Sequence, residues 1–347
     1  MTGKTTIEWC SAVWNPTTGC TRVSEGCTNC YAFALHDKRF KANVDRARSH
    51  GFLGPWLIDD DGPITTSSRE RGDPMPFPKQ YDLPFSRVQL LPDRLDDPLR
   101  HRKPERYFVD SMADLFHEDV PDEYLDQVFA AMMLAKRHTF LVLTKRPERM
   151  RDYMLARPTG PLIGKEWYRS RIRYVDGESL GMSISGVNAY SWPPANVWLG
   201  TSVEDQASAD ERIPHLLATP AAVRFLSCEP LLGPVDLTGG WSDYLGANPS
   251  RQAWTTESGH ANDRSCHDDQ HNNCPVPVQV PTRRVNWVII GGESGARARP
   301  MDLAWLTSLV ESSMAAGVPV FVKQDSGARP GRQGRIPDEL WIREFPR

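Results

Sequence analysis

The amino-acid sequence predicts an α/β protein built as a full or partial (β/α) barrel, with a cysteine-bearing loop near its N-terminus. Short apolar or β-branched runs recur along the chain, and helical patterns separate several of them. This alternation is typical of parallel strands joined by crossover helices. The number of such units, roughly six to eight, favours a barrel over an open sheet. An open, doubly wound sheet is the alternative.

The predicted elements follow in chain order. Residues 31–48 read as a helix, and the stretch 50–84, rich in Gly, Pro and Asp, is predicted to be an irregular connection. Apolar residues at helical spacing predict three further helices, over 120–137, 204–219 and 302–317. The predicted strands cover residues 87–90, 106–109, 139–143, 196–199, 223–226, 286–290 and 318–322.

A single barrel-like domain is expected over residues 1–347, with residues 16–31 as the loop that carries the cysteines. Two insertions interrupt the alternation, at 155–195 and 238–284, and the second is strongly polar. It contains the string CHDDQHNNC. That string is either a structural metal site or an incidental polar loop, and its ligands would be Cys266, His267, His271 and Cys274.

Composition excludes several classes of protein. The chain is 39% hydrophobic and 24% charged, as in ordinary globular proteins. No apolar run approaches the roughly 20 residues that span a bilayer, and the N-terminus lacks a secretory pattern. The net charge of −3 excludes a histone-like polycation but permits a local basic groove. We expect a cytoplasmic enzyme or binding protein, without membrane association and without a disulfide framework.

The sharpest motif is a cysteine triplet, C-x6-C-x2-C, formed by Cys20, Cys27 and Cys30. Three thiolates can hold a [4Fe–4S] cluster by three of its irons and leave the fourth open to a cofactor or substrate. Gly19 and Gly26 allow a tight backbone path around such a centre.

Spacing alone leaves other interpretations open. Zinc is the alternative metal, with His36 as a fourth ligand, and a loop without metal is the third interpretation. Tyr31, next to the triplet, can shield a cluster from solvent. Cys10 and Cys228 stand alone, and lone buried cysteines behave as small hydrophobes.

Polar residues follow directly after most predicted strands, where a parallel barrel carries its functional loops. These clusters read DSMAD, TKRP, TSVED, SCEP, GGESG and KQD. Together they predict a polar cavity at the mouth of the barrel. Helix caps such as Ser202 and Asp302, and ion pairs across the mouth, are the structural alternatives.

Several sequence blocks occur together and in order, among them TTIEWCSAVWNPTTGCTRVSEGCTNCYA, YFVDSMADLF, TFLVLTKRPERM, FLSCEPLLGPVDL and WVIIGGESG. With these blocks the chain resembles the phage-associated three-cysteine-motif proteins over residues 6–324, apart from the two insertions. That family is similar in turn to radical S-adenosylmethionine (SAM) enzymes, which have a partial barrel of the radical-SAM/TIM type and an N-terminal cluster loop. Those enzymes usually carry C-x3-C-x2-C, so the first spacing is longer here.

The resemblance implies a [4Fe–4S] cluster on the cysteine triplet and reductive cleavage of SAM, with electrons from a flavodoxin- or ferredoxin-type donor. The expected substrate is a nucleotide or nucleic acid, in DNA or RNA modification or repair. The alternative is a zinc-stabilised, phage-derived nucleic-acid-binding or accessory protein without redox chemistry. The residues expected to bind the cofactor are Tyr31, Asp110, Ser111, Asp114, Lys145, Ser202, Glu204, Glu229 and Glu293. Those expected to bind the substrate are Arg146, Lys323 and Gln324.

Overall fold

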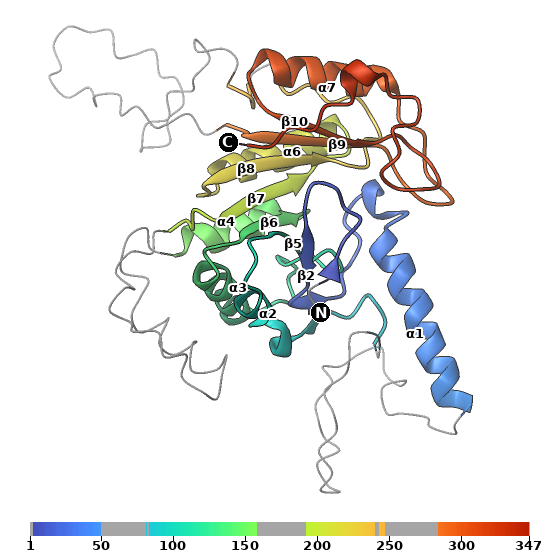
Figure 1. The fold of residues 1–347 in the computed structure, drawn as a ribbon, viewed down its shortest axis with the longest axis vertical. Coiled ribbons are helices and arrows are strands. Elements are labelled where there is room, and N and C mark those ends of the chain that lie inside the picture. Colours follow the sequence, from blue (N-terminus) through green and yellow to red (C-terminus); the bar gives the residue numbers. More distant parts are fainter. Residues whose placement is uncertain are drawn as a thin grey trace, which may run out of the picture.

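A curled sheet of eight strands forms a half-barrel in this computed structural model (Figure 1). The structure describes residues 3–49, 81, 83–157, 192–239, 243–246 and 284–346. Seven strands run parallel and follow one another in chain order: β2 (Ala12–Trp14), β5 (Arg106–Val109), β6 (Thr139–Thr144), β7 (Val197–Ser202), β8 (Val223–Cys228), β9 (Trp287–Gly291) and β10 (Val320–Gln324). This confirms the partial barrel. A doubly wound sheet would reverse its strand order, and this sheet does not.

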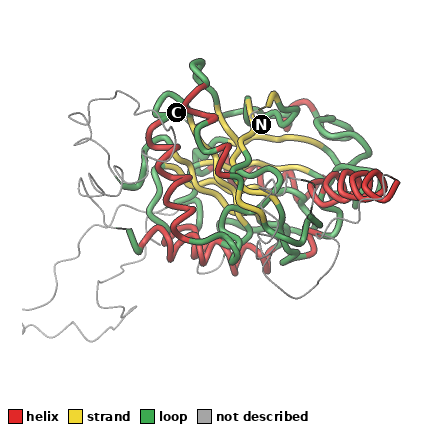
Figure 2. The backbone as a smooth tube through the Cα atoms, turned by 90° about the horizontal axis from the view of Figure 1, so that it is seen from below, coloured by secondary structure: helices red, strands yellow, loops and turns green. Residues whose placement is uncertain are grey.

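Helices cover the outer side of the sheet (Figure 2). Four of them follow strands: α3 (Asp122–Leu134), α4 (Pro147–Leu155), α6 (Gln206–Ala218) and α7 (Leu303–Ala315). The structure also describes α1 (Tyr31–Ser49), which lies apart from these four in Figure 1, and the short α2 (Asp97–Arg100).

Local signals explain where these helices begin. Asp205 caps α6 in a reciprocal capping box with Ser208, and the Asp302 carboxylate accepts from the N–H of Ala304 at the start of α7. Pro147 occupies the first turn of α4, where its missing N–H costs nothing. The predicted cap at Asp302 is therefore confirmed, whereas the one at Ser202 is wrong because Asp205 caps that helix.

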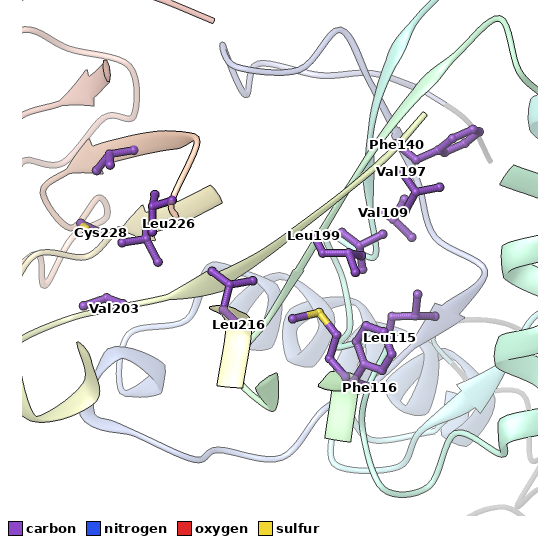
Figure 3. Packing of buried hydrophobic residues seen from close by; sticks show 14 of the residues in the cluster. Val109, Leu115, Phe116, Phe140, Val197, Leu199, Val203, Leu216, Leu226 and Cys228 are labelled. Atoms are coloured by element: carbon purple, nitrogen blue, oxygen red, sulfur yellow. The ribbon is translucent and has the colours of Figure 1, made fainter. Parts of the chain in front are cut away.

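Alternate residues of each strand enter two separate cores. Outward-facing residues such as Val109, Leu199 and Leu226 pack with helix residues such as Leu216 (Figure 3). Inward-facing residues form a second cluster, rich in aromatic rings, on the concave side: Phe108, Leu141, Phe225, Trp287, Ile289 and Phe321. Because both faces are buried, the strands read as continuous apolar runs, which is what made them visible in the sequence.

The C-terminal segment closes the amino end of the half-barrel. The N–H of Val322 donates to the carbonyl of Ile342 at 2.8 Å, so the segment lies along the free edge of β10. Phe345 packs on Trp287 with ring centroids 5.4 Å apart, and the Arg106 guanidinium lies 3.9 Å from the Phe345 centroid. The segment thus covers an unpaired edge and fills the concave side from below.

Three sequence predictions need correction or extension. The run 87–90 is not a barrel strand: β4 (Gln89–Leu90) pairs with β3 (Thr17–Thr18) in a separate two-stranded antiparallel sheet. The first barrel strand is β2, which pairs antiparallel with β1 (Gly3–Lys4) and parallel with β5. Three residues are too few for a periodic signal, so β2 was not predicted. The sequence does not predict helix α4 either, because the TKRP block is interpreted there only as a polar cluster after a strand.

The insertions lie largely outside the described residues, and CHDDQHNNC lies entirely outside them. Within the second insertion, Tyr244 and Leu245 are buried and belong to the outer core. Among the helices that the structure describes, none is both long and apolar enough to cross a membrane.

The C-terminal segment offers a test of how the half-barrel is closed. Phe345→Ala should lower the free energy of unfolding by about 2 kcal/mol, because it removes the ring that contacts Trp287 and Arg106. Urea unfolding measures the change. Met314→Ala, at a side chain that is largely exposed on α7, is the control and should leave stability nearly unchanged. Equal effects of the two substitutions would contradict the proposed closure.

Candidate functional site

A cavity of about 480 Å³ lies at the carboxyl ends of the strands, beneath the cysteine loop. The structure brings most of the predicted site residues to its wall: Cys20, Cys27, Cys30, Tyr31, Asp110, Ser111, Asp114, Lys145, Arg146, Ser202, Glu229, Glu293 and Lys323. Glu204 and Gln324 are buried and are not part of the lining. The expected cavity at the barrel mouth is therefore present with charged groups in its wall, but most of its lining surface is apolar rather than polar.

The three cysteines come from different parts of the loop. The N–H of Cys20 donates to the Phe85 carbonyl at 2.8 Å, Cys27 ends a short 3-10 helix, and Cys30 directly precedes α1. All three are free thiols and partly exposed in the same cavity. In the described ranges, no group of three His, Cys, Asp or Glu side chains is arranged to hold a single metal ion.

His36, the candidate fourth ligand for zinc, lies elsewhere. Its ring is buried between Tyr81 and Phe85, with centroids 5.1 Å from each, and it does not line the cavity. Cys10 and Cys228 are both buried, and burial raises the pKa of each thiol to about 12. Cys228 lies in the outer core beside Leu226 (Figure 3). The prediction that these two cysteines are small core residues is confirmed.

The thiols of the triplet differ in their ionisation. Burial alone would raise the pKa of Cys27, but a hydrogen bond from the Val23 backbone, the positive charge of the Lys145 ammonium and hydrogen bonds from Ser24 bring that pKa below its ordinary value. Burial and the Asp114 carboxylate raise the pKa of Cys20 to about 12, and the nearby Arg146 guanidinium opposes them. Cys27 therefore forms the thiolate, the form in which cysteine binds metals, more readily than Cys20 does.

Glu204, just after β7, anchors the middle of the cysteine loop. Its carboxylate pairs with Lys145 and, at 2.8 Å, with Arg212, and it accepts from the Ser24 hydroxyl at 3.1 Å. The backbone of Gly26 lies so close that a Cβ there would come within 2.5 Å of the Glu204 Oε1 atom. Only glycine permits this approach. Glu204, predicted to bind cofactor, holds the loop in this structure.

Glu293, after β9, anchors the end of the same loop. It forms a bidentate pair with Arg299, with one N–O distance of 2.7 Å, and accepts from the Asn29 amide at 3.0 Å. Asn29 also donates to the Arg297 carbonyl at 2.9 Å. Burial opposes ionisation of Glu293, but the Arg299 and Asn29 hydrogen bonds bring its pKa below the ordinary value. Both oxygens of this carboxylate are thus engaged by the chain itself.

Arg146 ties the first cysteine to the end of β6. Its guanidinium lies 3.7 Å from the Cys20 sulfur, donates to the Thr21 hydroxyl at 2.7 Å, and pairs with Asp114 at 3.2 Å. The Asp114 carboxylate also accepts from the Thr144 hydroxyl at 2.7 Å. The predicted substrate contact Arg146 therefore serves as a bridge between the loop and two strand ends.

Asp110 fastens the start of the loop to β5. It is buried, its φ of 60° lies in the left-handed region, and its carboxylate accepts from the N–H and hydroxyl of Thr17 at 3.1 and 2.8 Å. Next to it, Ser111 donates to the Asn15 side chain at 3.1 Å, and its carbonyl accepts from the Tyr31 hydroxyl at 2.6 Å. These contacts fix the ring of Tyr31 at the cavity wall.

The opposite wall carries a second charged pair. Lys323 on β10 pairs with Glu229 after β8, and the Gln324 amide donates to Glu229 at 3.3 Å and to the Gly292 carbonyl at 2.7 Å. Lys323 and Glu229 line the cavity, whereas Gln324 supports them from behind.

Sequence reasoning missed the residues that position the site rather than line it. Asn29, Arg299 and Arg212 carry the anchoring contacts described above, and Ser24 and Thr17 supply hydroxyl donors. Asn29 and Ser24 had a local signal, because each lies between two cysteines of the motif.

The close approach of Gly26 to Glu204 gives a testable consequence. Gly26→Ala should displace the loop and increase the rate at which its thiols react with iodoacetamide, with a loss of about 1–3 kcal/mol in unfolding free energy. Gly327→Ala is the matched control, since a Cβ there has open space around it. Unchanged alkylation in the Gly26 variant would show that the loop is not held by this contact.

Burial of Asp110 predicts a pH dependence. Burial raises its pKa to about 8, and the hydrogen bonds from Thr17 oppose this shift. Between about pH 4 and pH 8 the folded protein keeps a proton that the unfolded chain loses, so this group makes the free energy of unfolding fall as pH rises, and the fall ends above pH 8. The slope contributed is at most about 1.4 kcal/mol per pH unit.

Asp110→Asn removes this titration and keeps a residue that tolerates left-handed backbone. In urea unfolding from pH 5 to pH 9, the free energy of unfolding of the variant should rise relative to that of the wild type as pH increases. Parallel curves would contradict the raised pKa.

Comparison with known proteins gives one match. A family model described as a protein of unknown function, DUF5131, matches residues 4–339. No curated protein and no solved structure matches the chain. The matched region includes the cysteine loop, the seven parallel strands and the four helices on the outer side. The chain therefore belongs to the DUF5131 family.

Proposed function

We propose that this protein is a radical-SAM-like iron–sulfur enzyme, which cleaves SAM reductively to act on a nucleotide or nucleic acid. The observation that carries the proposal is the placement of three free thiols from one loop over the carboxyl ends of a parallel half-barrel, facing one cavity. In barrels of this kind the functional groups lie at that end.

The donor set fits a [4Fe–4S] cluster. Cys20, Cys27 and Cys30 would be its ligands, and three ligands of a cubane bind three different irons rather than one ion. Lys145 and the Ser24 contacts favour the thiolate of Cys27. When bound, the reduced cluster would supply the electron that cleaves the sulfonium of SAM.

The remaining residues would position and protect the reactants. Trp9, Phe85 and Phe108 form apolar walls of the cavity, which exclude water. The Lys323–Glu229 pair offers a cation and a carboxylate on the wall formed by the ends of β8 and β10. A SAM molecule carries both an ammonium and a carboxylate. On binding, Lys323 would pair with the SAM carboxylate and Glu229 with the SAM ammonium, in place of their present pairing with each other.

The resemblance to phage-associated three-cysteine-motif proteins supports a nucleotide or nucleic-acid substrate. The proposal includes an external electron donor of the flavodoxin or ferredoxin type. It places the enzyme in the cytoplasm, where thiols stay reduced.

The test treats the three cysteines as one unit. Replacing any one of Cys20, Cys27 or Cys30 by Ala should remove most bound iron and nearly all formation of 5′-deoxyadenosine, because ligands of one cluster act together. Iron and sulfide per chain are measured after anaerobic purification, and 5′-deoxyadenosine after dithionite reduction with SAM.

Cys10→Ala and Cys228→Ala are the controls and should keep their iron, since both thiols are buried and neither lines the cavity. Replacing Cys266 or Cys274 should affect at most a second metal. A colourless wild-type protein with one stoichiometric zinc would overturn the proposal in favour of a zinc-stabilised accessory protein. A loaded cluster that never yields 5′-deoxyadenosine would retain the metal site and remove the radical chemistry.

A further inference from the structure

We infer that the mouth of the cavity binds single-stranded nucleic acid through three arginines, Arg22, Arg297 and Arg329, here called the arginine rim. This inference narrows the substrate class of the site and rests on the function proposed above. A free nucleotide would fill the cavity but would not reach the whole rim, since Arg297 and Arg329 lie outside the cavity lining. The main ligand is therefore a strand rather than a free nucleotide.

Three separate segments bring these arginines to one place. Arg22 lines the cavity, and Arg329 stands between two residues, Ala328 and Pro330, that also line it. The carbonyl of Arg297 accepts from Asn29 in the cysteine loop at 2.9 Å. The loops after β9 and β10 lie side by side, because the N–H of Gly295 donates to the carbonyl of Gly327 at 2.9 Å.

The rim differs in charge from the interior of the site. Inside, the cations are neutralised: Lys145 pairs with Glu204, and Lys323 with Glu229. At the rim all three arginines are exposed, and among the described residues no carboxylate forms an ion pair with any of them.

The acids beside the rim already have other partners. Glu25 lies 3.6 Å from Arg299, and Glu8 pairs with Arg343 at 3.0 Å. The rim is therefore a concentration of positive charge on a chain whose net charge is −3. Exposed guanidinium groups without acidic partners match the spaced phosphates of a nucleic-acid backbone.

Exposed apolar surface accompanies the charge. Tyr31 is 52% exposed and Val23 46%, although both line the cavity, and the Tyr31 hydroxyl is held by the Ser111 carbonyl. The Arg22 guanidinium lies 4.4 Å from the centroid of the Phe33 ring. Rings and guanidinium planes beside basic groups are the elements on which unpaired bases stack.

The position of the thiols selects a single strand over a duplex. The cysteines lie in the cavity wall rather than on an open surface. A base inside a duplex cannot reach such a pocket, whereas an unpaired base can enter while its neighbouring phosphates stay at the rim.

The experiment measures binding of a fluorescein-labelled single strand of about 12 nucleotides by fluorescence anisotropy, using the full chain. The double variant R297Q/R329Q removes two rim charges from two loops other than the cysteine loop, and it leaves unchanged the backbone carbonyl of residue 297 that Asn29 contacts. Its affinity should fall roughly tenfold or more at low salt, and the slope of log Kd against log salt should decrease by about 1.4.

R102Q/K103Q is the matched control. These two residues are also exposed, but they precede β5 at the opposite, amino end of the sheet. The control should bind as the wild type does, and circular dichroism should show both variants folded. DNA and RNA strands of equal length identify the preferred backbone.

Three results would overturn the inference: equal binding by R297Q/R329Q and the wild type, competition by a mononucleotide or polyglutamate as strong as that of the strand, or tighter binding of a duplex. The assay requires neither iron nor SAM, so its outcome is independent of the cluster. Strand binding without SAM cleavage would support the arginine rim as a binding site and contradict the proposed enzyme activity. SAM cleavage without strand binding would support the enzyme activity and contradict the binding role of the rim.

Discussion

The buried carboxylate of Glu204 is the constraint on which the site depends. It is almost fully buried between two cations, Lys145 and Arg212, and also accepts from Ser24. A buried charge is tolerated only when its partners are in place, and removing one partner costs several kcal/mol, typically about 3–5. Ser24 and Gly26 belong to the cysteine loop. The hydrogen bond from Ser24 to Glu204 and the close approach of Gly26 to it therefore fix the position of the loop.

The other strand ends repeat this arrangement with different chemistry. Glu293 holds Asn29, Arg146 holds Thr21 and the Cys20 sulfur, and Asp110 holds Thr17. Each contact joins a short-range feature of the loop to a strand far away in the chain. A loop fastened at several points to a rigid sheet presents its thiols in a defined geometry, which is what a metal centre requires.

The two ends of the half-barrel differ in structure. At the amino end, Phe345 and Trp287 fill the concave side, and the C-terminal segment covers the edge of β10. At the carboxyl end the same side opens into the cavity, where charged pairs such as Lys323–Glu229 lie in the wall beside aromatic residues. The packed aromatic residues at the amino end therefore form an apolar base, and the charged groups and the cysteine loop lie at the carboxyl end.

The sequence by itself determined the alternation of strands and helices, the cysteine triplet, and the polar clusters at the strand ends. These are local patterns: strands buried on both faces are continuous apolar runs, and strand-end loops begin where those runs stop. Only the tertiary structure decided the roles of the polar residues. Asn29 and Glu293 are 264 positions apart, and no spacing rule connects them.

For the same reason the short strand β2 and the pairing of β4 with β3 were invisible in the sequence. Elements of two or three residues exist because a distant partner supplies their hydrogen bonds, not because their own residues have a preferred period. Whether a charged strand-end residue faces a ligand or anchors the loop is likewise set by which side chains the folded sheet brings beside it. The local sequence specified the chemical groups of this site, and the long-range contacts of the fold assigned their functions.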